Sequence, residues 1–172
     1  MHPRLSVLVA AAAAALLVPA VTPAAGTRLL VLTERNVDGL RLGQTLAQAR
    51  GTGRIGPTTP GCELASPRPL AARLRPPLKG FATFDGKAPH RLLSLDVTGG
   101  AQTTRHVRVG TSAVAARRAY PEAHLRTSKP SDPLQLTALI VKRGGKDRIW
   151  LMLNRPGGRV TDLAVPGPQL CE

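Results

Sequence analysis

The densest cluster of side chains that could do chemistry in this chain is basic. Lys142, Arg143, Lys146 and Arg148 surround a Gly-Gly pair, a sequence typical of a hairpin tip. Lysine binds phosphate as a point charge, and arginine binds it as a bidentate donor. Arg143, Lys146 and Arg148 are therefore candidate residues for binding a polyanion. The alternative is a charged turn that keeps the hairpin from pairing with another chain.

No spacing of residues predicts catalysis or metal binding. Residues 51–56 spell G-x-G-x-x-G, but they would follow a helix and run into prolines, unlike a dinucleotide-binding loop. His90, His106 and His124 lack the spacing and the acidic neighbours of a metal site. No G-x-S-x-G elbow occurs. We predict no catalytic residue, metal or cofactor. A hydrolase with an unrecognised pair of carboxylates is the one enzymatic alternative.

The chain has two cysteines, Cys62 and Cys171. An even number in an exported protein predicts a disulfide, and two cysteines allow a single intramolecular pairing. Two free thiols or an intermolecular bridge are the alternatives. The intramolecular bond would close a long loop, for which the chain-entropy model gives roughly 4–5 kcal/mol of stabilisation.

Residues 1–25 have the features of a secretion signal. Arg4 is followed by an apolar, alanine-rich run over residues 5–17 and by small residues suited to cleavage. The apolar run is shorter than the ~20 residues of a membrane span, which argues against a retained anchor. We expect a mature chain of residues 26–172, secreted to the extracellular space, with the cell wall as a candidate location.

The charge of the chain favours anionic partners. It has 24 Lys and Arg against 10 Asp and Glu, a formal net charge of +14. The alternative is a compositional origin, because Arg, Ala, Gly and Pro are all frequent, as in a GC-rich genome. One Trp, one Tyr and two Phe are too few for the stacking that single-stranded nucleic acids need, so we expect no specific nucleic-acid partner.

The elements that would position these residues are organised by an internal repeat. Residues 40–50 and 107–117 share a pattern of apolar, Arg, apolar, Gly, a polar residue, a hydroxyl residue and an Ala-rich run. Gly43 and Gly110 are predicted turns, and Thr45 and Ser112 are predicted N-caps of short helices.

The match continues downstream, where residues 91–97 align with residues 159–165. Predicted strands cover residues 28–32, 70–74, 81–84, 91–97, 136–141, 148–153 and 159–165, and the proline-rich stretch 51–77 is otherwise loop. Two repeats, about 28–97 and 104–165, would each bury one helix on three antiparallel strands. We therefore predict a single α+β domain with one sheet of six or seven strands and short helices on one face.

These two units resemble the beta-lactamase-inhibitor-protein superfamily, whose relatives include outer-membrane lipoproteins of the SmpA/OmlA type, and they resemble small secreted actinobacterial proteins most. Members of the inhibitor branch bind a protein on the open face of the sheet. The resemblance implies a monomeric, non-enzymatic module that binds a protein or an envelope component. A basic, polyanion-binding envelope protein is the alternative.

Overall fold

The protein is mostly β. The computed structural model describes residues 28–129 and 135–169, so the predicted secretion signal and Cys171 lie outside the described part. Of the described residues, 47% are in strands and 9% in two helices. The strands form two sheets, one of eight strands and one of four. The prediction of an α+β domain built on a single sheet of six or seven strands is therefore wrong.

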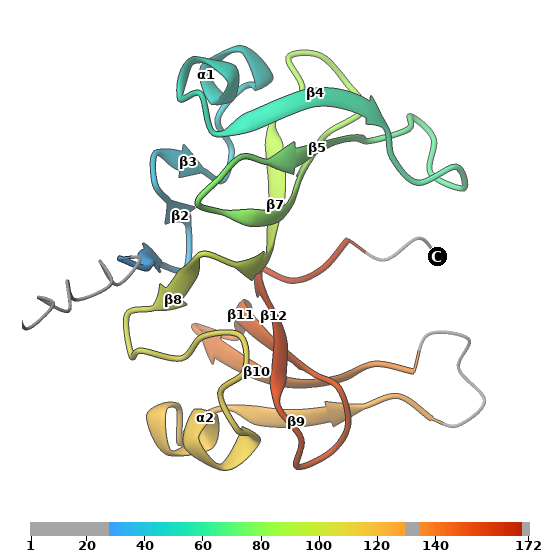
Figure 1. Cartoon of the computed structure of the whole chain (residues 1–172). Coiled ribbons are helices and arrows are strands. Elements are labelled where there is room, and N and C mark those ends of the chain that lie inside the picture. The colour runs from blue at the N-terminus through green and yellow to red at the C-terminus, as the bar shows by residue number, and fades with distance from the viewer. Residues whose placement is uncertain (1–27, 130–134, 170–172) are drawn as a thin grey trace, which may run out of the picture.

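The larger sheet has the strand order β4-β5-β6-β7-β12-β11-β10-β9, and all its neighbours are antiparallel. Its strands are β4 (Ile55–Pro60), β5 (Leu70–Leu74), β6 (Lys79–Phe84), β7 (Leu92–Gly99), β9 (His124–Thr127), β10 (Thr137–Arg143), β11 (Lys146–Leu153) and β12 (Val160–Val165). Each half is a four-stranded meander. The halves meet where Leu163 of β12 lies opposite Val97 of β7, and they form the upper and lower parts of Figure 1.

The smaller sheet has the order β3-β2-β1-β8. It consists of β1 (Leu30–Leu32), β2 (Asn36–Val37), β3 (Leu40–Arg41) and β8 (Ala101–Thr103). β1 and β8 pair in parallel, which joins the first strand of the described residues to the start of the second half. The small sheet and the two helices, α1 (Leu46–Gly51) and α2 (Ala113–Ala119), lie to the left in Figure 1.

Two strands of the large sheet were not predicted, because the local features of their sequences favour loops. β4 contains Pro57 and Pro60, which a central strand would exclude, but β4 is an edge of the sheet, where a missing N–H is tolerated. β9 is fully exposed and lacks an apolar alternation, so no strand was predicted there. These two edge strands and the small sheet make the difference between the predicted and the observed sheets.

The two halves begin with matched glycine turns. Gly43 has φ 84° and Gly110 has φ 89°, a backbone region that favours glycine. The N–H of Gly43 donates to the carbonyl of Leu92 at 2.8 Å, and the N–H of Gly110 donates to the carbonyl of Val160 at 2.8 Å. In both halves, the turn is thereby attached to the last strand of its own meander.

An arginine then closes each turn. Arg91 donates from its guanidinium to the carbonyl of Gly43 at 2.9 Å, and Arg159 donates to the carbonyl of Gly110 at 2.8 Å. These two arginines are the residues that begin the aligned segments 91–97 and 159–165. Such matched hydrogen bonds are what two repeats of one unit would give.

Each helix follows with a hydroxyl N-cap. Thr45 accepts from the N–H of Gln48 at 3.3 Å, and the Gln48 side chain accepts from the N–H of Thr45 at 2.9 Å, which completes a capping box. Ser112 accepts from the N–H of Ala115 at 3.2 Å, but the methyl side chain of Ala115 cannot accept a hydrogen bond from the N–H of Ser112. Both helices have fewer than eight residues, so they depend on packing against the sheet.

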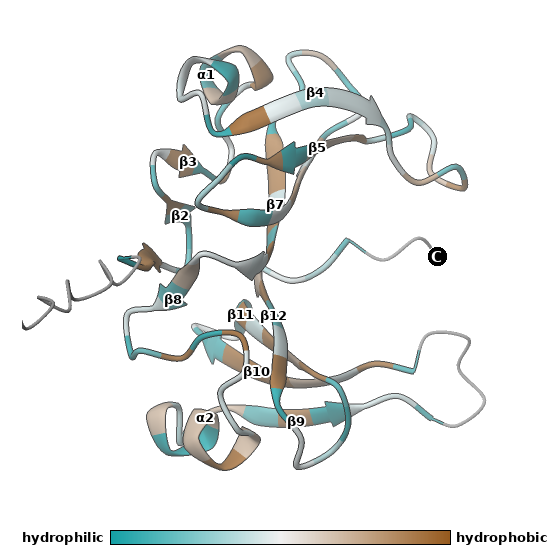
Figure 2. Ribbon diagram, in the orientation of Figure 1, coloured by the Kyte–Doolittle hydropathy of each residue, from teal (hydrophilic) through white to brown (hydrophobic). Residues whose placement is uncertain are grey.

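The main core lies between the large sheet and the elements at the left of Figure 1. Its fully buried members are largely aliphatic, and they include Leu95, Val97, Leu151 and Leu163 from the central strands. Figure 2 shows brown, apolar segments on β4, β7 and β12 interspersed with polar ones. This alternation leaves the opposite face of the large sheet with a separate, smaller cluster, made of Ala138, Ile140, Trp150 and Ala164.

Candidate functional site

The face of the large sheet that carries this smaller cluster, called here the open face, is the candidate site. One cross-strand row runs over seven of the eight strands. Its members are Arg73, Phe81, Asp96, Ala164, Trp150, Ile140 and His124. Because cross-strand neighbours project on the same side, these side chains form one surface.

Two arginine–aromatic pairs lie on the open face. The guanidinium carbon of Arg73 lies 5.7 Å from the ring centroid of Phe81, and that of Arg126 lies 5.2 Å from Trp150. Phe81 is 46% exposed, whereas Trp150 is 5% exposed. A cation–π contact contributes about 0.5–1 kcal/mol at an exposed site, enough to bias the arginine toward one position. Aromatic and arginine side chains are also the types most enriched at the centres of protein interfaces.

The segment after β12 crosses this face and covers Trp150. A Cβ added to Gly167 would lie 3.0 Å from Nε1 of the indole, so the two are in close contact. The same Nε1 donates to Oδ2 of Asp147 at 3.1 Å. In Figure 1 the segment runs from β12 into the space between the upper and lower halves. Trp150 is therefore buried, although it belongs to the smaller cluster and not to the main core.

Beside this segment is a pocket of about 270 Å³. Gln169 lines it together with Cys62 and with four residues of β6 and β7, namely Phe81, Thr83, Ser94 and Asp96. No lysine or arginine is among the described residues that line it. Gln169 thus lies at the same pocket as Cys62, and Gln169 is two residues before Cys171 in the chain. This arrangement is compatible with the predicted disulfide.

Asp96 is the electrostatically unusual residue of this pocket. Burial, and then the negative charge of Asp162 on β12, raise the pKa of its carboxyl group to about 6. Its Oδ1 atom is buried and has no hydrogen-bond partner in the described part of the chain. Ser94, its neighbour on the same face, is 2% exposed. β7 thus carries two polar side chains at alternate positions in the middle of the sheet.

Asp96 was not among the residues that the sequence predicted to form a site. The available signal was the order Ser94-Leu95-Asp96-Val97, which places a hydroxyl and a carboxyl group on one face of a strand. Only the order of the strands shows that β7 is central and that the open face lies around it.

The predicted polyanion-binding residues belong to a different region. Nη1 of Arg143 lies 2.7 Å from Oε1 of Glu34, and Nε of Arg148 lies 4.0 Å from Oε2 of the same residue. Lys146 pairs with Arg143 across the hairpin of β10 and β11 and is exposed. Glu34 thus neutralises part of the cluster and links the hairpin to the turn between β1 and β2. Arg143 also lines a recess of about 350 Å³ together with Arg35 and Glu34, so a carboxylate lies in the same recess as the two arginines.

The predicted turn and cap residues stabilise the fold and lie away from the candidate site. Gly43, Thr45, Gly110 and Ser112 lie at the starts of α1 and α2, and their hydrogen bonds are made within these turns and caps. None of them lines the pocket beside Asp96. They hold the helices against the sheet and have no direct part in the open face.

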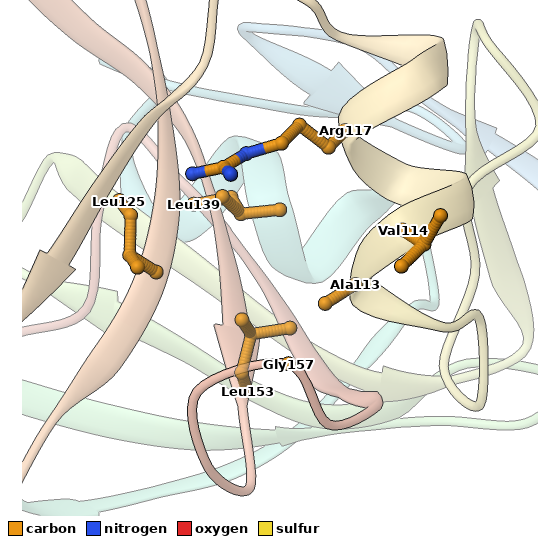
Figure 3. A pocket seen from close by; sticks show the side chains of 7 residues that line it. All are labelled: Ala113, Val114, Arg117, Leu125, Leu139, Leu153 and Gly157. Carbon is orange, nitrogen blue, oxygen red and sulfur yellow. The ribbon is translucent and has the colours of Figure 1, made fainter.

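A second, smaller pocket of about 110 Å³ lies beside α2. Figure 3 shows Arg117 of α2 extending toward Leu139 and Leu125, with Leu153 and Ala113 below. Val114 and Leu125 at this pocket are 61% and 45% exposed. Its volume is well below that of pockets that hold small-molecule ligands, so this pocket is a groove at the margin of the main core.

In residues 28–129 and 135–169, no group of three His, Cys, Asp or Glu side chains could hold a metal ion. No helix in the same part of the chain has the length and apolar character needed to cross a membrane. Comparisons with protein-family models, with curated proteins and with solved structures found no match for this chain.

Proposed function

We propose that this protein is a secreted, non-enzymatic module that binds another protein through the open face of its large sheet. The observation that carries the proposal is the surface around Asp96, where Phe81 is half exposed under Arg73 and a pocket opens beside it. Interface energy is concentrated in such aromatic and arginine residues next to pockets. The predicted secretion signal and the resemblance to the inhibitor superfamily favour the same kind of partner.

The test compares two matched variants of the mature protein as bait in the culture fluid and envelope fraction of the producing cells. Phe81→Ala removes an exposed aromatic from the open face, and Val114→Ala removes an exposed aliphatic side chain from α2. A partner retained by the wild type and by Val114→Ala should be lost with Phe81→Ala. With that partner purified, calorimetry should give an affinity at least about tenfold weaker for Phe81→Ala, as for an interface hot spot.

If Phe81→Ala retained the partner as well as the wild type does, the open face would not be the binding surface.

Salt dependence separates the proposal from the polyanion alternative. Phosphate-polymer binding weakens steeply as salt rises, because bound counterions are released. Protein binding centred on Phe81 and Arg73 should change by much less over the same range.

A further inference from the structure

We propose that the pocket beside Asp96 receives a lysine or arginine side chain of the protein partner, with Asp96 as its counter-ion. The inference rests on the proposed function, because it places one residue of the partner on the open face. It adds the chemistry that selects the partner, a cationic side chain presented at a protein surface.

The first argument is an unsatisfied oxygen. Oδ1 of Asp96 is buried and makes no hydrogen bond to any described residue. Buried polar groups without partners are rare in native structures, because each one loses its hydration without compensation. Asp96 is on a central strand, where a hydrophobic residue would be expected to pack better. Rotation of the carboxyl group would bring this oxygen to the pocket that Asp96 lines, where an incoming N–H donor would satisfy it.

The second argument is the local sign of charge. The chain has 24 Lys and Arg, yet none of the described residues lining this pocket is basic. The neighbouring charge that shifts the pKa of Asp96 is that of Asp162, which is also negative. Arg73 lies over the ring of Phe81 but does not line the recess, so Asp96 is the one charged residue of the described lining. A cation gains from both carboxylates, whereas an anion is repelled by both.

The third argument is the shape and chemistry of the remaining wall. Phe81 lines the pocket and is 46% exposed, so part of its ring is accessible to a cation. The hydroxyl groups of Thr83 and Ser94 line the same space and can accept hydrogen bonds from an ammonium or guanidinium group. The volume of about 270 Å³ lies just below the usual range for small-molecule pockets, which suits one long side chain.

A metal ion fits this pocket less well than an alkyl cation. Asp96 is the one carboxylate among the described lining residues, and hard cations need several oxygen ligands. No group of three metal-ligating side chains occurs in the described part of the chain. Ordered water is the simplest competing occupant, since it could donate to Oδ1. The test below separates water from a cationic side chain.

The experiment titrates the ¹⁵N-labelled mature protein, with its cysteines oxidised, with blocked amino acids. Nα-acetyl-lysine amide and Nα-acetyl-arginine amide are the cationic probes, and the norleucine and citrulline derivatives are their neutral counterparts. At least one cationic probe should shift the amide signals of Thr83, Ser94 and Asp96 saturably at millimolar concentration. The neutral probes should bind at least about tenfold more weakly, because a hydrogen bond to a charged group is lost.

Asp96→Asn is the decisive variant, and Glu122→Gln is its control. Both remove one negative charge, but Glu122 is exposed and pairs with Arg105. Binding of the cationic probe should fall about tenfold or more in Asp96→Asn and should not change in Glu122→Gln. Equal binding of charged and neutral probes, unchanged binding in Asp96→Asn, or no saturable shift at tens of millimolar would each overturn the proposal and leave water as the occupant.

The same variants separate this inference from the proposed function. If a partner depends on Phe81 but binds Asp96→Asn as well as the wild type, the open face is the binding surface and the cation pocket is wrong. If the lysine or arginine probe binds through Asp96 while no partner depends on Phe81, the pocket is a cation site, but the protein-binding function and the assignment of the cation to a protein partner are wrong.

Discussion

At the scale of single residues, the carboxyl group of Asp96 lowers the stability of the fold at the candidate site. Its carboxyl group occupies a central strand, and burial raises its pKa to about 6. A raised pKa means that the folded protein disfavours the charged form, so the ionised carboxylate lowers the free energy of unfolding near neutral pH. Residues that are costly to stability and lie beside a pocket are typical of functional positions.

Replacing Asp96 by Asn should therefore stabilise the protein near neutral pH. The pKa in the unfolded chain is the ordinary 3.8, and in the folded protein it is about 6. The penalty is absent below the lower value, grows as pH rises between the two, and is complete above the higher one. Urea unfolding at a pH of about 7.5 should show a gain of up to roughly 3 kcal/mol for Asp96→Asn, and at about pH 4 most of this gain should be absent.

Glu122→Gln is the control, with the opposite sign. A backbone hydrogen bond at Glu122 and the neighbouring Arg105 lower the pKa of this exposed carboxyl group. Its contribution is present above the unfolded pKa and lost as pH falls, so Glu122→Gln should not gain stability at neutral pH. A gain from Asp96→Asn that did not change between the two pH values would show that the cause is packing and not ionisation.

At the scale of elements, the sequence predicted what is local and missed what depends on neighbours. Residues 70–74 were predicted as a strand, and β5 has these bounds. Gly43 and Gly110 have the positive φ that a turn requires, because this property belongs to the residue and its immediate bonds. β4 and β9 were missed because their sequences resemble loops, and only pairing with β5 and β10 makes them strands.

The candidate site was missed for the same reason. Alternation along β7 separates two faces but does not say which face is covered by helices. The basic hairpin was the strongest local signal, and its meaning depends on Glu34, which lies far from it in the chain. A charge pattern in a sequence identifies the charged residues, but the residue that each of them pairs with depends on the tertiary fold.

The matched turns give an element-scale prediction. A Cβ at Gly43 or Gly110 would meet no atom within 4 Å, so replacing either by Ala adds no clash. Positive φ remains unfavourable for alanine, by about 1–2 kcal/mol. Gly43→Ala and Gly110→Ala should each lower the free energy of unfolding by about this amount, and by similar amounts to one another, in urea or thermal unfolding.

Gly51→Ala is the matched control. Gly51 also has open space around it, but it ends α1 and is not among the residues with positive φ. Alanine is the better helix former, so this variant should gain about 0.5–1 kcal/mol. Unequal costs at Gly43 and Gly110 would show that the two turns are not equivalent parts of a repeated unit.

At the scale of the whole molecule, the C-terminal segment joins regions that the chain order keeps apart. It leaves β12 in the centre of the large sheet, packs Gly167 on Trp150 of β11, and brings Gln169 to the pocket that Cys62 lines on the far side of β7. Non-covalent contacts of so few residues are weak on their own. A covalent anchor at the end of the segment would hold it across the open face.

The predicted bond between Cys62 and Cys171 is that anchor, although Cys171 lies outside the described residues. Trp150 is the chain's single tryptophan, so its fluorescence reports directly on the cover that Gly167 provides. Under denaturing, non-reducing conditions, intact mass after alkylation should show no modified cysteine. Reduction, Cys62→Ser and Cys171→Ser should each shift the emission of Trp150 to the red and increase its quenching by acrylamide.

The single and the double serine variants should lose the same stability, because either change opens the same loop. The loss should be of the order of 4 kcal/mol in the chain-entropy model. Alkylation of both cysteines without reduction would show that the bond is absent. Reduced stability without a change at Trp150 would show that the bond exists but does not hold the segment over the open face. In that case, the pocket beside Asp96 would keep its walls from β6 and β7 and would be open where Gln169 now lies.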